Sequence, residues 1–328
     1  MPLRLSGSAL MLLAGSLVTA CADGQGERPI DLAELCVSSA CGERVVLLDI
    51  PSAENLTFSE DGRLFVSSGQ QVVEVTRDGD GAFQATVISE SACGFTGLVV
   101  REGHLYAACS DGRFWGARLE PQPRLRPIHR FADMCLANGA ALGADGRIYV
   151  VDEPLMPCVP DPKIKRLTLD PADPLRVIDE ALWLQGSPLG QLHLGLDTVL
   201  RFPNGLQSRG RRFFGTDGGS IYAVDLQADG SAGPVQPLHF EPDIHDDLGI
   251  AGEGLLLAQF GTGRITLLGA DGAVLQSTDP GTFRFPSSVR LGRPPMFAPT
   301  DVLVTETGVL GDNNLPLDHL SLFRRRAD

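Results

Sequence analysis

Apolar residues alternate with other residues over short stretches of this chain, and turn dipeptides separate the stretches. In one of them Leu56 and Phe58 occupy alternate positions, Asp61-Gly62 follows, and a second apolar run covers residues 64–66. Alternation with a period of two predicts a strand with one buried face, and Asp-Gly supplies the positive φ angles that tight hairpins need. The pattern therefore predicts short antiparallel strands, and no amphipathic helix of convincing length interrupts it.

This unit recurs along the chain with a period of about 42 residues. One residue at the start of each unit serves as its reference, and six such residues are found: Glu54, Thr96, Asn138, Asn204, Asp246 and Ser287. Four of the five intervals measure 41 or 42 residues, and the third measures 66. A β-sandwich would not give so regular a long period. Six units of three or four strands predict an all-β protein, a six-bladed β-propeller in one domain over residues 44–328.

Three segments depart from the repeat. A strand at residues 45–50 precedes the first unit, and we expect it to pair with residues 320–323 and close the ring. The long interval, at about 152–197, is rich in proline and is expected to be an insertion that covers one end of the axis, as a lid or as a partner surface. Residues 21–43 are expected to form a polar tether, shortened by a Cys36–Cys41 loop.

The first 20 residues have the composition of a secretory signal. Arg4 precedes an apolar run at residues 10–18, which is too short for a stable membrane span, and small residues lead to Cys21. Val-Thr-Ala-Cys resembles the lipobox of bacterial lipoproteins, which implies a lipidated Cys21, and Ala22 resembles the signal for outer-membrane sorting. We therefore expect an exported cell-envelope lipoprotein that contacts membrane only through this lipid, at the periplasmic or cell-surface side. The alternative is plain secretion with Cys21 incidental.

Six further cysteines form an even set, which predicts three disulfides in an oxidising compartment. Closeness in sequence indicates only the Cys36–Cys41 pair, and the pairing of Cys93, Cys109, Cys135 and Cys158 stays open. No Cys-x-x-Cys pair occurs, so a zinc ribbon or a thioredoxin-like motif has no support.

Composition and charge narrow the classes of partner. Of the 328 residues 43% are hydrophobic, which is ample for a core, and the net charge of −14 argues against nucleic acid and anionic lipid surfaces. No Gly-x-Ser-x-Gly elbow, His-Glu-x-x-His motif, phosphate loop or dinucleotide fingerprint is present. The sequence 78–81, Asp-Gly-Asp-Gly, is interpreted as a hairpin rather than a calcium loop. We expect a monomer that acts on a small molecule.

Four of the six reference residues carry side-chain oxygen: Glu54, Asn138, Asn204 and Asp246. If each begins the innermost strand of its blade, all four side chains converge at one end of the axis. Oxygen donors of this kind suit a hard cation such as Ca²⁺, although another divalent ion would also be compatible, whereas zinc favours His or Cys. The alternative is that Asn and Asp merely begin strands, because both favour turns.

Several motifs resemble the gluconolactonase/regucalcin (senescence marker protein) family of six-bladed propellers. They are Glu54-Asn55-Leu56, Asn138-Gly139-Ala140, Phe202-Pro203-Asn204-Gly205-Leu206, Asp246-Asp247-Leu248 with Gly261-Thr262-Gly263-Arg264, and Phe285-Pro286-Ser287-Ser288-Val289. The resemblance covers about residues 45–323, and strictosidine-synthase-like proteins and paraoxonases are more distant relatives. It implies a Ca²⁺ ion bound by Glu54, Asn138, Asn204 and Asp246.

Two positions depart from the family pattern. Asp246-Asp247-Leu248 stands where the family usually has Pro-Asp-Gly, so the ligand register can shift by one residue. The use of two adjacent ligands in paraoxonase-like members would make Asp247 an additional ligand. Gly139 stands where gluconolactonase-like members often carry an Asp that shapes the substrate pocket, so a sugar lactone is not implied.

The resemblance implies a calcium-dependent hydrolase of lactones or related esters. The cation would polarise the carbonyl, and Asp246 would take a proton from the attacking water. The alternatives are a non-catalytic, lipid-anchored binding propeller with a structural calcium, and isomerase- or synthase-type chemistry. His245 is adjacent to Asp246, but strand alternation would turn it away, and it is interpreted as a surface-loop residue. The remaining conspicuous basic residues are assigned structural or solvated positions: His104, Arg118, Arg211 and Arg212.

Overall fold

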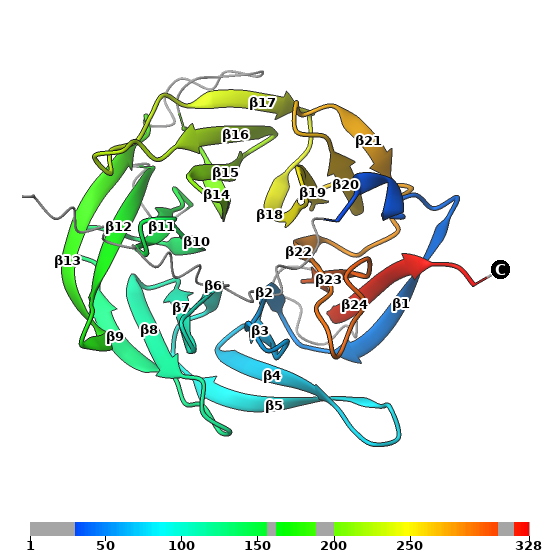
Figure 1. Ribbon diagram of the computed structural model, residues 1–328, viewed down its shortest axis with the longest axis horizontal. Coiled ribbons are helices and arrows are strands. Elements are labelled where there is room, and N and C mark those ends of the chain that lie inside the picture. The colour runs from blue at the N-terminus through cyan, green and yellow to red at the C-terminus, as the bar shows by residue number, and fades with distance from the viewer. Residues whose placement is uncertain (1–29, 156–161, 188–199, 308–317, 328) are drawn as a thin grey trace, which may run out of the picture.

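The computed structural model of the chain describes residues 30–155, 162–187, 200–307 and 318–327. These residues form 24 strands in six four-stranded antiparallel sheets, which are arranged as blades around a central axis (Figure 1). The predicted six-bladed β-propeller in a single domain is confirmed. The predicted signal at residues 1–20, together with Cys21, lies outside the described residues.

The first three blades follow one another along the chain, and each begins at the axis and ends at the rim. Blade 1 consists of β2 (Ala53–Phe58), β3 (Leu64–Ser68), β4 (Gln71–Arg77) and β5 (Phe83–Glu90). Blade 2 consists of β6 (Phe95–Arg101), β7 (His104–Cys109), β8 (Arg113–Arg118) and β9 (Arg126–Arg130). Blade 3 consists of β10 (Ala137–Leu142), β11 (Ile148–Asp152), β12 (Lys163–Asp170) and β13 (Asp173–Gln185).

The last three blades repeat this order, and the final one combines both ends of the described chain. Blade 4 consists of β14 (Pro203–Arg209), β15 (Arg212–Asp217), β16 (Ser220–Asp225) and β17 (Gln236–Phe240). Blade 5 consists of β18 (His245–Ala251), β19 (Gly254–Gln259), β20 (Arg264–Leu268) and β21 (Val274–Ser277). Blade 6 consists of β22 (Pro286–Leu291), β23 (Val302–Glu306), β24 (His319–Arg325) and β1 (Gly42–Asp49).

The predicted ring closure is confirmed. Strand β1 pairs with β24, so that Val45 lies opposite Leu322 and Val46 opposite Ser321. Each innermost strand also contacts the innermost strands of both neighbouring blades, which closes a ring around the axis. Radial repetition of this kind leaves few exposed sheet edges.

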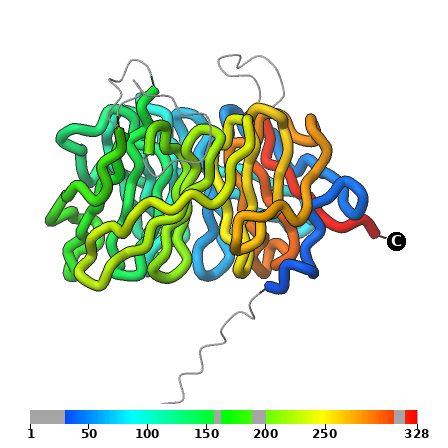
Figure 2. The backbone as a smooth tube through the Cα atoms, turned by 90° about the horizontal axis from the view of Figure 1, so that it is seen from above, coloured from blue at the N-terminus to red at the C-terminus, as the bar shows by residue number. Residues whose placement is uncertain are grey.

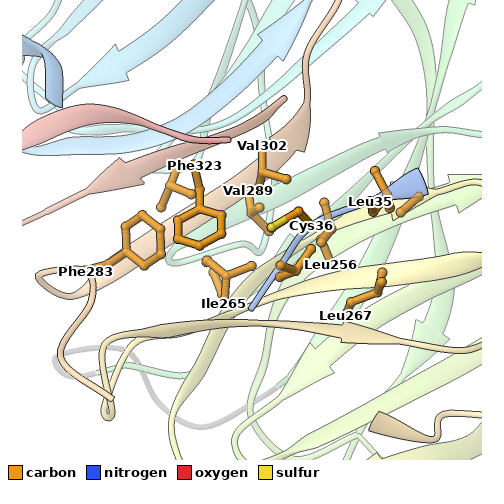
Figure 3. Packing of buried hydrophobic residues seen from close by; sticks show 13 residues of the cluster. Leu35, Cys36, Leu256, Ile265, Leu267, Phe283, Val289, Val302 and Phe323 are labelled. Atoms are coloured by element: carbon orange, nitrogen blue, oxygen red, sulfur yellow. The ribbon is translucent and has the colours of Figure 1, made fainter. Parts of the chain in front are cut away.

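Apolar packing lies between the blades. Six clusters of buried hydrophobic residues are found in the described part of the chain, and each joins two neighbouring blades. The cluster between blades 5 and 6 contains Ile265, Val289 and Phe323, and Figure 3 shows Leu35 and Cys36 packed among them. Side chains that alternate along each strand therefore bury both faces of a blade, since each sheet has a neighbour on either side.

The prediction that residues 21–43 form a polar tether is wrong for the part that the structure describes. Leu35, Cys36 and Val37 are almost fully buried against blades 5 and 6, and a 3-10 turn, η1 (Leu32–Glu34), precedes them. Gln276 fixes the segment, because its side chain accepts from the Val37 amide at 2.9 Å and donates to the Leu35 carbonyl at 3.1 Å. The segment is therefore part of the propeller.

The predicted insertion at about 152–197 is also corrected. Residues 163–170 and 173–185 form β12 and β13, the two outer strands of blade 3, so these residues are not a lid. The remaining extra sequence, at residues 156–161 and 188–199, lies outside the described residues. The long interval therefore contains the ordinary outer half of a blade together with that additional chain.

Glycines with positive φ occupy most of the predicted hairpin turns. Gly62 has φ 84° and Gly146 has φ 74°, as tight hairpins require. In blade 5 the glycine with positive φ is Gly252. Blade 6 differs from the other blades, because a longer connection that contains a cis peptide bond between Pro294 and Pro295 separates β22 from β23.

Disulfides join cysteines in the described part of the chain. The Cys36–Cys41 pair is confirmed, Cys93 is joined to Cys109, and Cys135 is also disulfide-bonded. Cys158 lies outside the described residues. Among the described residues no helix is long and apolar enough to cross a bilayer.

Candidate cation site

The predicted ligands occupy equivalent positions in four blades. Glu54, Asn138, Asn204 and Asp246 are each the second residue of the innermost strand, in β2, β10, β14 and β18. Each of these strands has a bulge there, because the pairing with the second strand shifts register immediately after the first residue. A bulge adds an unpaired residue and re-aims side chains, which suits positions that turn toward the axis.

Hydroxyl groups hold the backbone of these bulges. Thr216 Oγ1 accepts from the Gly205 amide at 2.8 Å and donates to the Asp246 carbonyl at 2.5 Å. Thr305 Oγ1 donates to the Glu54 carbonyl at 2.9 Å. Each hydroxyl comes from the second strand of one blade and reaches the innermost strand of the next, so neighbouring ligand positions are tied together.

Glycine follows both asparagines for a steric reason. A Cβ at Gly139 would clash with the Asn204 carbonyl oxygen and would lie 2.8 Å from the Leu206 nitrogen. A Cβ at Gly205 would lie 2.5 Å from Asp247 Oδ1 and 2.6 Å from Asp247 Cα. Glycine at these positions therefore allows the innermost strands to approach closely enough for their ligands to meet, and this explains Gly139 without reference to a substrate.

A fifth side chain joins the four predicted ligands. Glu153 follows β11 and is 4% exposed, and its carboxylate accepts from Asn138 Nδ2 at 2.7 Å and from Asn204 Nδ2 at 3.4 Å. The sequence prediction missed it because it lies outside the innermost strands. We use the term candidate cation site for the set Glu54, Asn138, Glu153, Asn204 and Asp246.

The surroundings of the three carboxyl groups of the site disfavour their ionised forms. The pKa of Glu54 is raised to about 7, mainly by burial; the hydrogen bond from Thr307 opposes this shift and the charge of Asp247 adds to it. The pKa of Glu153 is also raised to about 7, again mainly by burial; the hydrogen bond from Asn138 opposes this shift and the charge of Glu54 adds to it. Burial likewise raises the pKa of Asp246, and the charges of Glu54, Glu153 and Asp247 raise it further. The charged groups that shift these three pKa values are therefore all carboxylates, which places the side chains close together.

The chemistry of this donor set fits a hard divalent cation. Carboxylate and amide oxygens are the ligands that Ca²⁺ takes, at about 2.3–2.6 Å. Buried carboxylates that raise one another's pKa need either protons or a cation to offset their charge. The residues present therefore fit the Ca²⁺ that the sequence prediction named.

Asp247 has different surroundings from Asp246. Its Oδ2 accepts from Ser288 Oγ at 2.7 Å, from Asn55 Nδ2 at 2.8 Å and from Arg290 Nη2 at 2.8 Å. Its Oδ1 is buried and has no hydrogen-bond partner in the described part of the chain. We call Asn55, Asp247, Ser288 and Arg290 the Arg290 cluster. Of the two carboxylate oxygens of Asp247, only Oδ1 is available to an ion. That Asp247 is an additional ligand of the cation stays a prediction.

His245 points away from the candidate cation site, but it is not the surface-loop residue that was predicted. It is 1% exposed, and its Nε2 is 3.0 Å from the Gly219 carbonyl oxygen of blade 4. Burial lowers its pKa to about 4, so the imidazole is neutral at pH 7. Of the other basic residues, Arg118 is exposed in β8, the third strand of blade 2, and His104 stacks on Tyr106 in β7, the second strand.

A cavity of about 860 Å³ opens at the other end of the axis. It is lined by the last residues of the innermost strands, among them Phe58, Ser208 and Leu291, and by Ile30. The described chain begins at this end, on the lower face in Figure 2. Because the convergent carboxylates lie at the opposite ends of the same strands, we place the candidate site with the carboxylates and not with the cavity.

One other group of possible metal ligands is excluded. In the part of the chain that the structure describes, Cys93, Cys109 and Asp111 place three possible ligand atoms within 4.8 Å of one another. The two cysteines are joined in a disulfide, so neither offers a thiolate to a metal. The three carboxylates of the candidate cation site do not all lie within this limit of one another.

Comparisons with known proteins give the fold a context. Regucalcin from Agrobacterium tumefaciens, described as a calcium-binding protein, is 14% identical with a TM-score of 0.64, over 86% of this chain and 93% of that chain. A luciferin-regenerating enzyme is 13% identical with a TM-score of 0.64, over 86% of this chain and 95% of that chain. A protein described as a candidate gluconolactonase is 17% identical with a TM-score of 0.64, over 88% of this chain and 94% of that chain.

At the level of sequence the chain stands apart. No protein-family profile matches it, and no curated protein sequence matches it. Identities below 20% over nearly the whole length show a shared fold and do not transfer an activity. The chain is a six-bladed β-propeller of the kind found in regucalcin, gluconolactonase-type proteins and luciferin-regenerating enzyme.

Proposed function

We propose that this protein is a calcium-dependent hydrolase of lactones or related esters. One observation carries the proposal: three carboxylates and two amides from four blades meet at the axis, and the charges that shift the pKa values of the three carboxyl groups are those of carboxylates. Such a group is stable in its ionised form only with a bound cation. Similar structures described as a calcium-binding protein and as a gluconolactonase support this direction.

A bound Ca²⁺ supplies Lewis acidity that polarises a carbonyl and stabilises a developing oxyanion. Glu54, Asn138, Asn204 and Asp246 would hold the cation. Asp246 accepts a proton from the attacking water as the new C–O bond forms. The ring or ester C–O bond then breaks, and the proton passes to the departing oxygen, which yields a carboxylic acid and an alcohol.

Turnover tests this function directly. A panel of lactones and aryl esters is offered to the purified protein with and without a chelator. We expect turnover that the chelator abolishes, that Asp246→Asn loses, and that His245→Gln keeps, because the amide of Gln can still donate to the Gly219 carbonyl. Thermal unfolding of both variants checks that they fold.

The outcomes separate the candidate functions. Turnover that survives both the chelator and Asp246→Asn contradicts the metal mechanism. Calcium that stabilises the fold without turnover on any member of the panel identifies a non-catalytic binding propeller with a structural ion instead. Turnover lost equally in His245→Gln would mean that the buried imidazole takes part in the reaction.

We also propose that the protein is exported and anchored to the cell envelope through lipid on Cys21. The disulfides of Cys36 with Cys41 and of Cys93 with Cys109 support an oxidising compartment. Cys21→Ser is expected to move the protein from the membrane fraction to the soluble fraction of expressing cells. Retention in the membrane fraction would contradict the anchor.

A further inference from the structure

Glu153 occupies a position that all six blades share. In each blade the first residue of the innermost strand pairs with the last residue of the second strand, and one residue directly follows that pair in the second strand's direction. Across the six blades these following residues are Gly69, Ser110, Glu153, Gly218, Phe260 and Thr307. Blade 3 alone places a carboxylate there. In blade 6 the equivalent Thr307 donates to Glu54 Oε2 at 3.2 Å, so this position reaches the candidate cation site.

The backbone holds Glu153 firmly over the site. Asp152 Oδ1 accepts from the amides of Cys135 and Leu136, both at 3.0 Å, and the Glu153 amide donates to the Leu136 carbonyl at 2.9 Å. These bonds tie the end of β11 to the segment that leads into β10, where Asn138 lies. The position of Glu153 is therefore set by regular structure.

Glu153 interacts with every one of the four predicted ligands. It accepts from both asparagine amides, and its charge contributes to the raised pKa of Asp246, while the charge of Glu54 contributes to its own raised pKa. Its side chain is almost completely buried, so water does not screen it. A buried carboxylate in the middle of a ligand set is costly unless it shares the cation.

We propose that Glu153 is a fifth protein ligand of the cation and its third carboxylate. This inference rests on the proposed function, because it adds a residue to the same site. Affinity for Ca²⁺ increases with the number of charged ligands. With three carboxylates against a divalent ion, the loaded site keeps one negative charge in excess, which also favours a trivalent ion at this site.

Terbium provides a readout that is independent of turnover. The difference between Tb³⁺ luminescence lifetimes in H₂O and D₂O counts the water molecules bound directly to the ion. The experiment compares the wild type, Glu153→Ala, the near-isosteric Glu153→Gln and the control Asp133→Asn. Asp133 also lies beside blade 3, but its carboxylate pairs with Lys163 and Lys165. Calcium affinity is measured by calorimetry on the same four proteins.

We expect Glu153→Ala to bind about one or two additional waters on Tb³⁺, and Glu153→Gln to bind Ca²⁺ at least about 10-fold more weakly than the wild type. Asp133→Asn should match the wild type in both measurements. An unchanged water count in Glu153→Ala would overturn the inference even if affinity falls, because a residue that only positions the asparagines changes affinity alone. A wild type that binds neither ion would contradict the proposed function itself, so the two failures differ.

Discussion

The candidate cation site and the Arg290 cluster are neighbours along the axis, and each contains buried carboxylates. In the Arg290 cluster Asp247 faces a guanidinium at 2.8 Å and accepts from two further donors, and the protein itself supplies the positive charge. In the candidate cation site the charged groups that act on Glu54, Glu153 and Asp246 are carboxylates. Asp246 and Asp247 are adjacent in one strand, but the protein offsets the charge of Asp247 with an arginine and does not offset the charge of Asp246.

This difference shows which acidic group needs an external partner. An arginine offsets Asp247 because Arg290 lies in β22, on the innermost strand of the next blade. The groups around Asp246 are instead amides and further carboxylates. The Arg290 cluster should therefore control stability whether or not a cation is present, and the candidate cation site should respond to the cation.

The largest expected effect is at the Arg290 cluster. Arg290→Leu leaves Asp247 buried without its cationic partner, and loss of one member of a buried pair costs about 3–5 kcal/mol of unfolding free energy. Urea unfolding at saturating Ca²⁺ measures this loss. Arg324→Leu is the control, since Arg324 lies at the surface 3.9 Å from Glu43 and should cost less than about 1 kcal/mol. Equal losses in the two variants would remove the contrast between the groups.

Asp246→Asn should separate ion binding from stability. We expect Ca²⁺ affinity to fall by at least about 100-fold, more than residues that only support ligands usually contribute. The ion-free variant should nevertheless be more stable than the ion-free wild type, because one of the mutually repelling carboxyl groups is gone. Calorimetric titration and thermal unfolding in chelator measure the two effects. An ion-free variant that is much less stable than wild type would argue that Asp246 is structural.

The pH dependence of the ion-free protein follows from the raised pKa of Glu54 and of Glu153, about 7 in the folded state against 4.5 ordinarily. Between these values the folded state binds more protons than the unfolded state, so stability is full below about pH 4.5 and is lost as the pH rises through 7. His245, with its pKa lowered to about 4, acts in the opposite direction below pH 6.5. Urea unfolding in chelator between pH 6.5 and 8 should therefore show falling stability, and added Ca²⁺ should reverse the fall. An unfolding free energy that does not change over this pH range would contradict the raised pKa values of Glu54 and Glu153.

The smallest expected effect concerns substrate charge. If Glu153 leaves one negative charge in excess on the loaded site, an anionic lactone or ester should have a kcat/KM about fivefold lower than a neutral analogue, since one unit charge at about 4 Å is worth about 1 kcal/mol in water. Raising the salt concentration should narrow the difference. Glu153→Gln should remove it, and an unchanged preference in that variant would assign selectivity to other residues.

Most of the fold and four of the five site residues could be predicted from the sequence, because the 42-residue period marks them. Glu153 was missed because its counterparts in the other blades are mostly Gly, Ser or Thr, which carry no cation chemistry. Strand β12 was taken for part of an insertion because the interval is long and rich in proline. Lys163 and Lys165 also hide the strand pattern, since they occupy buried positions that pairing with Asp152, Asp133 and Glu180 makes possible.

The N-terminal segment escaped prediction for a different reason. Leu35, Cys36 and Val37 form too short an apolar run to show a period, and only the groove between blades 5 and 6 gives them a place. A tertiary contact of this kind leaves no pattern in the sequence. The same holds for Asp247, whose role depends on Arg290 43 residues later in the chain.

Calcium titration of the ion-free protein at pH 8, read by calorimetry and by thermal unfolding, tests the central claim most directly. We predict one Ca²⁺ bound per chain, a melting temperature that rises with Ca²⁺ concentration, and loss of both effects in Asp246→Asn but not in Arg324→Leu. A wild type without binding heat and without a shift in melting temperature, or an Asp246→Asn variant that behaves like it, would contradict a cation held at the axis by these carboxylates.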